Sequence, residues 1–185
     1  MRNLDQIIKA YDVRGTYPDQ LDATLAREVG VAFVKVAKIA KREGGPGALV
    51  VGHDMRPSGP ELVGAFTDGV LSQGVDVVNI GLASTDALYF ASGHLNLPGA
   101  MFTASHNPAQ YNGIKLCRAG AAPVGQETGL AEIKQLISVD WSSDYDGPVG
   151  SATEQNLVDE YAKYLLKLVD LSSIRPLKVV VDAGN

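Results

Sequence analysis

Apolar positions in the first half of the chain alternate between helical spacing and short continuous runs. From Asp22 to about Glu43 they recur at steps of three and four residues, which predicts a helix capped by Asp22. Residues 44–47, Gly-Gly-Pro-Gly, are expected to end that helix. Residues 48–52 are continuously apolar, which is typical of a buried strand.

The alternation continues to residue 103. The pattern predicts helices over 58–73 and 84–95 and strands over 75–80 and 99–103. Ser58 and Glu61 stand three positions apart, as in a capping box, and Ser84 or Thr85 can cap the later helix. Alternating strands and helices indicate an α/β sheet with buried strands.

Asn112 and Gly113 interrupt this pattern, because the dipeptide readily adopts the positive φ angles of a tight turn. A strand over 114–117 is expected to follow. The strands on either side of the preceding loop are then antiparallel. The expected fold is a three-layer α/β/α arrangement with a mixed, mainly parallel sheet.

Polar, turn-rich residues after a predicted helix over 127–137 indicate a domain boundary. The predicted organisation is a first domain over 1–140, a linker over 141–153 and a second domain beginning at 154–185. Within that last segment a helix over 155–171 and a strand over 177–181 are expected. One helix and one strand cannot form a stable domain, so the second domain is expected to be truncated.

Composition narrows the class of protein. Apolar residues make up 45% of the chain, enough for a full core, and the formal net charge of -5 argues against a nucleic-acid partner. The polar N-terminus lacks a signal sequence, and no apolar run approaches the roughly 20 residues that a membrane helix needs. The single cysteine, Cys117, cannot form an internal disulfide. We therefore expect a soluble, cytoplasmic protein that engages neither nucleic acid nor membrane.

The candidate chemistry gathers between two strand-like runs, in Thr103–Pro108 and Asn112–Lys115. Ser105 is the candidate covalent carrier, a role in which a hydroxyl needs help from a base or a metal. His106 and Lys115 can donate to phosphate oxygens and can move protons. Asn107, followed by Pro108, would fix the shape of the loop. The alternative is a solvated turn beside a surface lysine.

Two further groups of residues precede this loop. In Tyr11–Gly15 the fork of Arg14 suits a phosphate and Tyr11 adds a hydroxyl, although a structural turn with an Asp12–Arg14 contact explains the pattern equally well. After the strand over 48–52, Asp54 and Arg56 are interpreted as an ion pair that braces the loop. Asp144 and Asp146 form the only close Asp-x-Asp pair, and without a third carboxylate they are interpreted as solvated linker.

These motifs, in this order and spacing, resemble the N-terminal part of an α-D-phosphohexomutase, the phosphomannomutase/phosphoglucomutase family. The strings are Tyr-Asp-Val-Arg-Gly at 11–15, Gly-His-Asp-Met-Arg-Pro-Ser at 52–58, Thr-Ala-Ser-His-Asn-Pro at 103–108 and Asn-Gly-Ile-Lys at 112–115. The resemblance implies that Ser105 is the phosphoserine. It implies catalytic roles for His106, Lys115 and Arg14. It further implies phosphate or substrate binding by Tyr11, Arg14, Asn107 and Lys115.

The resemblance also implies a cofactor, Mg²⁺, bound by the phosphate on Ser105 and by aspartates of an Asp-x-Asp-x-Asp loop in the second domain. This sequence ends before that loop, so the expected partners are hexose phosphates and further C-terminal domains of the same chain. The implied activity is interconversion of hexose 1-phosphate and 6-phosphate, of mannose and/or glucose, through a phosphoserine and a bisphosphate. The chain alone is expected to be inactive.

Three alternatives remain open. The chain could be a non-catalytic module that binds sugar phosphates or a partner, or a phosphoglucosamine mutase fragment. It could also be a serine phosphotransferase or phosphatase outside the family, which would need a complete metal site within these residues.

Overall fold

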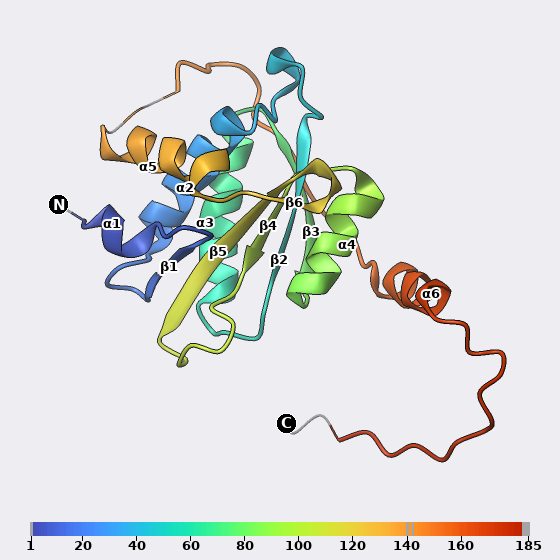
Figure 1. The fold of residues 1–185 in the computed structure, drawn as a ribbon. Helices are drawn as coiled ribbons and strands as arrows, with labels where there is room; N and C mark the ends of the chain where they lie inside the picture. Colours follow the sequence, from blue (N-terminus) through green and yellow to red (C-terminus); the bar gives the residue numbers. More distant parts are fainter. Residues whose placement is uncertain (1, 140, 142, 183–185) are drawn as a thin grey trace.

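A twisted sheet of seven strands organises the computed structural model, which describes residues 2–139, 141 and 143–182 (Figure 1). The strand order is β1-β5-β4-β2-β3-β7, and β6 pairs with β5. The strands are β1 (Val13–Thr16), β2 (Ala48–His53), β3 (Asp76–Leu82), β4 (Gly99–Phe102), β5 (Tyr111–Arg118), β6 (Ala122–Pro123) and β7 (Ala152–Glu154). The helices are α1 (Leu4–Ile7), α2 (Ala23–Val36), α3 (Gly59–Leu71), α4 (Thr85–Leu95), α5 (Leu130–Ser138) and α6 (Val158–Leu168).

Strand directions confirm the mixed, mainly parallel sheet. β2 runs parallel to both β3 and β4, and β3 runs parallel to β7. β5 is antiparallel to β1, β4 and β6, so among the strands of the described residues it alone runs in the opposite direction. β4 and β5 are neighbours, and the loop that joins them lies at the end of the sheet where β2 also ends.

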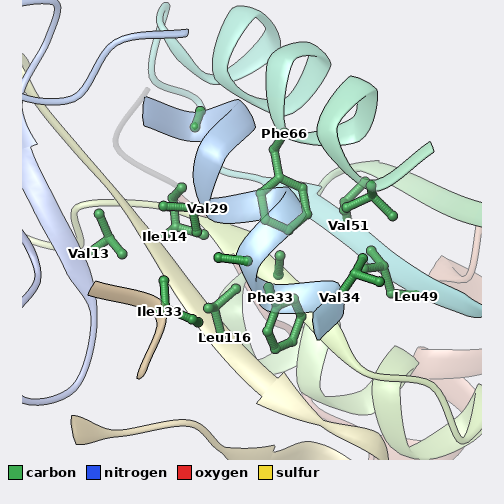
Figure 2. Close-up of a cluster of buried hydrophobic side chains, with 14 of the residues drawn as sticks. Val13, Val29, Phe33, Val34, Leu49, Val51, Phe66, Ile114, Leu116 and Ile133 are labelled. Atoms are coloured by element: carbon green, nitrogen blue, oxygen red, sulfur yellow. The ribbon is translucent and has the colours of Figure 1, made fainter. Parts of the chain in front are cut away.

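Helices cover both faces of the sheet, which confirms the three-layer α/β/α fold. Successive residues of a strand point to opposite faces, and Val51 of β2 belongs to the core under α2, α3 and α5, whereas Val50 belongs to the core under α4. Figure 2 shows the first of these cores, with Phe33 of α2 and Phe66 of α3 among the strand residues. The aromatic ring of Phe66 meets that of Phe102 edge to face at 5.4 Å.

The helix predicted over residues 22–43 was too long. Asp22 caps it as expected, with its side chain accepting from the Leu25 N–H, but α2 ends at Val36. Lys38 then takes a left-handed conformation with φ of 51°. The N–H of Ile39 donates to Val34 and that of Lys38 to Lys35, which is a Schellman C-cap. The cap turns Ile39 into the core, where it is fully buried.

The turn predicted at Asn112 and Gly113 was also wrong, because both residues lie inside β5. The Asn112 side chain is fully buried and donates to the Ser58 hydroxyl at 2.8 Å. That contact uses the hydroxyl of the proposed capping box, and Ser58 makes no side-chain cap of α3. Gly113 is needed for space instead: a Cβ there would lie 2.6 Å from the carbonyl oxygen of Val13.

Beyond the central domain, the chain adds one strand and one helix. Residues 152–154, at the end of the predicted linker and the start of the predicted second domain, form β7 beside β3. Helix α6 packs on α4 through rings such as those of Phe90 and Tyr161, whose centroids are 5.2 Å apart. The strand predicted over 177–181 is absent from the described residues, since no neighbouring strand pairs with that segment. The domain boundaries themselves stay a prediction. Within the described residues, no helix combines the length and apolar character needed to cross a bilayer.

Candidate functional site

Ser105 lies in the exposed loop between β4 and β5, at the end of the sheet where ligand sites of α/β folds gather. Its backbone is left-handed, with φ of 53°. A residue other than glycine in this region costs of order 1–3 kcal/mol, so surrounding contacts must hold it there. Its Oγ lies 3.0 Å from Nδ1 of His106, which is also exposed. The structure therefore places a hydroxyl and an imidazole at hydrogen-bond distance on the surface.

Arg14 reaches the same loop from β1. Its Nη1 donates to Oδ1 of Asn107 at 2.5 Å and to the carbonyl of Ala104 at 3.3 Å. Arg14 can do this because β1 pairs with β5, where Arg14 stands opposite Gly113. The structure thus brings Arg14 and Asn107, both candidates from the sequence, into contact.

Asp12 links the two cationic side chains of the site. Its Oδ2 accepts from Nη2 of Arg14 at 2.5 Å and from Nζ of Lys115 at 3.1 Å. One carboxylate facing two cations leaves a net positive charge, which favours a bound anion. Nε of Arg14 is buried and meets no hydrogen-bond acceptor within the part of the chain described. The arrangement suits a phosphate group.

Arg56 holds the backbone of the serine loop from the other side. It is 8% exposed, and its Nη1 donates to the carbonyls of Pro108 and Tyr111, both at 2.8 Å. Its Nη2 donates to the carbonyls of Ser105 at 3.0 Å and Asn107 at 2.8 Å.

Asp54 completes this support. It pairs with Nε of Arg56 at 3.2 Å, and its Oδ2 also accepts from the hydroxyl of Thr103 at 2.7 Å. The same Thr103 oxygen accepts from the N–H of Ser105 at 2.9 Å. The ion pair that was inferred from the sequence to brace a loop therefore braces the loop that carries Ser105.

Other singled-out residues lie outside this cluster. Tyr11 is 82% exposed and makes no hydrogen bond to a described residue, so the structure does not bring its hydroxyl to Arg14. His94 stacks on Phe90, and Nδ1 of His53 lies 2.7 Å from the Asp54 carbonyl. Cys117 is fully buried, and burial raises the pKa of its thiol.

The residues described here do not form a Mg²⁺ site by themselves. They contain no group of three or more histidine, cysteine or acidic side chains that could hold a metal. Asp144 and Asp146 are exposed. Ser105 would contribute a ligand only through a phosphate on its hydroxyl.

Sequence reasoning did not select Asp12 and Thr103 as parts of the site. Asp12 was named in the sequence only as the partner of Arg14 in a structural turn, and the structure forms that contact and adds Lys115 to it. Thr103 had a weak signal: a threonine two residues before the candidate serine can bond its N–H, as in a Ser/Thr turn.

Fold and site together define a class of domain: a three-layer α/β/α unit with an exposed serine on the loop after a central strand. A family model described as phosphoglucomutase/phosphomannomutase, alpha/beta/alpha domain I, matches residues 5–141. The chain belongs to the phosphoglucomutase/phosphomannomutase family, and residues 5–141 correspond to its domain I.

Individual relatives agree with this assignment. The chain is 42% identical over 180 residues to a protein of Xanthomonas campestris pv. campestris named phosphohexose mutases, covering 96% of this chain and 38% of the relative. It is 37% identical over 187 residues to a phosphomannomutase of Salmonella montevideo, covering 100% and 39% respectively. The crystal structure of a phosphoglucomutase/phosphomannomutase family protein from Burkholderia thailandensis superposes with a TM-score of 0.78 at 37% identity, covering 100% of this chain and 40% of that one. The chain thus spans about 40% of the length of these relatives.

Proposed function

We propose that this chain is the phosphoserine-bearing part of an intramolecular phosphotransferase that interconverts hexose 1-phosphate and hexose 6-phosphate. Mannose and glucose phosphates are the proposed substrates, since relatives are named phosphomannomutase and the family model covers phosphoglucomutases as well. The carrying observation is the exposed Ser105 hydroxyl, 3.0 Å from Nδ1 of His106, on a loop that Arg14 contacts at Ala104 and Asn107.

Each side chain has a role in this proposal. In the donating step, the bond between phosphorus and Oγ of Ser105 breaks as an oxygen of the sugar forms a bond to the same phosphorus. The sugar hydroxyl loses its proton to a base, and Oγ takes up a proton that His106, 3.0 Å away, would supply. Arg14 and Lys115 would stabilise the charge on the transferred oxygens, the main source of catalysis in phosphoryl transfer. Asn107 would help to bind phosphate, and we retain Tyr11 for the same role.

Two successive transfers complete the reaction. The first yields a hexose bisphosphate, and the second returns a phosphoryl group from the other position of the sugar to Ser105. An exposed carrier suits this scheme, because the bisphosphate must reorient between the transfers. The domains beyond this segment are proposed as partners, and with them aspartates that would bind Mg²⁺. The segment alone should therefore be inactive.

We also propose a cytoplasmic location. The single cysteine is buried, which suits a reducing compartment.

The test is made on the product of the coding sequence extended past codon 185, incubated with a hexose 1,6-bisphosphate. Intact-mass measurement and peptide mapping should find one phosphate, on Ser105, and Ser105→Ala should abolish both the phosphate and the mutase activity. Ser138→Ala is the matched control, because that serine is exposed at the end of α5, and it should leave both unchanged. Normal turnover by Ser105→Ala would refute the carrier role. A natural stop after codon 185 would favour a binding module instead.

A further inference from the structure

All five N–H donors of the Arg56 guanidinium are used, and four of the five bonds go to backbone carbonyls of the serine loop and the first residue of β5. The fifth, from Nε, goes to Asp54. The four carbonyl bonds have lengths between 2.8 and 3.0 Å. A side chain that only neutralised Asp54 would not need these four hydrogen bonds to the backbone of one loop.

Hydrogen bonds link Ser105, Thr103, Asp54 and Arg56 in a ring. Its N–H donates to Thr103, whose hydroxyl donates to Asp54. Asp54 accepts from Arg56, and Arg56 donates to the carbonyl of Ser105. Both backbone polar groups of Ser105 are therefore fixed by side chains of one network. The backbone at the centre of this network is left-handed, with φ of 53° at Ser105.

We propose that Arg56, through its bond to the Ser105 carbonyl and through Asp54 and Thr103, is a positioning residue that sets the backbone of Ser105 and so keeps its hydroxyl directed outward beside His106. This inference rests on the proposed function of Ser105 as the phosphate carrier. The guanidinium of Arg56 donates to Asp54 and to backbone carbonyls, so its proposed effect on transfer is exerted through the loop.

Lysine at this position separates charge from geometry. Arg56→Lys keeps a cation beside Asp54, but its single nitrogen has three donors and cannot reproduce a planar fork of five. Arg42→Lys is the control, since Arg42 donates to the Gln73 carbonyl and stacks over the ring of Tyr145, away from the loop.

The first measurement is amide hydrogen exchange by NMR on the 185-residue chain. Arg56→Lys should speed exchange of the Ser105 amide about tenfold, the effect of weakening one hydrogen bond, while Val50 in β2 keeps its rate. Arg42→Lys should change neither. An unchanged Ser105 rate in Arg56→Lys would overturn the proposal.

Thr103 supplies a second pair of variants should Arg56→Lys fail to fold. Thr103→Val removes the hydroxyl that joins the Ser105 N–H to Asp54 at nearly constant volume, whereas Thr103→Ser retains it. Exchange at Ser105 should rise in Thr103→Val and return towards the wild-type rate in Thr103→Ser. Equal rates in the two variants would overturn the proposal.

The second measurement follows turnover in the extended product. Arg56→Lys should lower kcat about 10- to 100-fold with little change in KM for the sugar phosphate, because a displaced carrier slows transfer without altering sugar binding. A loosened loop with unchanged kcat would overturn the positioning role. Normal turnover by Ser105→Ala would instead remove the proposed function and leave the exchange result standing, so the two failures are distinguishable.

Discussion

Gly113 of β5 provides the sharpest test of how the strands beside the site are packed. A Cβ added there would lie 2.6 Å from the carbonyl oxygen of Val13 and 2.8 Å from that of Thr103. Both atoms are backbone, one in β1 and one just after β4, so neither can rotate away. The strands on the two sides of β5 would have to separate to admit Gly113→Ala.

The magnitude follows from two opposing effects. Overpacking of this kind costs about 1–3 kcal/mol, and two backbone contacts place Gly113→Ala near the upper end. Replacing glycine by alanine also restricts the unfolded chain, which returns up to about 1 kcal/mol. The net loss in unfolding free energy should be about 2 kcal/mol. For a protein of this size that lowers Tm by about 4–8 °C.

Gly64 offers the matched control, because the same methyl group is added in a different environment. Gly64 lies inside α3, and a Cβ there would meet nothing within 4 Å. Gly64→Ala should raise stability by about 0.5–1 kcal/mol, the usual gain in a helix interior. Thermal unfolding followed by circular dichroism measures both variants. A Tm for Gly113→Ala at or above that of the wild type would refute the close packing.

Two further predictions concern ionisable groups. Ser151, the residue before β7, donates its N–H and hydroxyl to Asp76, and these bonds lower the pKa of that carboxyl. The hydrogen bonds between Ser151 and Asp76 should therefore persist above about pH 4 and be lost as the pH falls through the lowered pKa. A carboxyl ¹³C titration of Asp76 and amide exchange at Ser151 check this, and an unshifted titration would contradict it. Burial raises the pKa of the Cys117 thiol, so a disulfide reagent at pH 8 should label it far more slowly in the folded chain than in urea. Equal rates in the two states would show that β5 does not bury it.

Elements whose apolar spacing shows which side is buried could be predicted from the sequence. The strand over 48–52 and the helix over 84–95 appear as β2 and α4 with nearly the predicted bounds, and Ser84 caps α4 by accepting from the Ala87 N–H. Their periodicity directly reflects which side faces the core. The end of α2 had no such sequence signal, because the left-handed residue that caps it is Lys38 and not a glycine. The turn carries Ile39 into the core, a contact that depends on the tertiary structure.

Asn112 and Gly113 show how tertiary context can reverse a local preference. As a dipeptide they favour a tight turn, but the structure uses the small size of Gly113 rather than its freedom of φ. Asn112 is likewise retained in the interior by the bond to Ser58, far away in the sequence. Neither contact is visible without knowing which strands are neighbours.

The candidate site could likewise be predicted only where its residues are close in the sequence. Ser105, His106 and Asn107 lie in one short loop, so the sequence alone placed them together. The contacts from Arg14 and Arg56 depend on the order of the strands.

β5 enters the sheet antiparallel between β1 and β4, and this single reversal organises the site. The serine loop joins β4 to β5, and next to this pair β2 lies beside β4 and β1 lies beside β5. β1 carries Arg14, and the segment after β2 carries Arg56. Each arginine donates to the loop from its own side. Arg14 donates to the Ala104 carbonyl and the Asn107 side chain, and Arg56 donates to the carbonyls of Ser105, Asn107 and Pro108. A parallel β5 would require a crossover connection in place of this short loop, and Ser105 would lose its support.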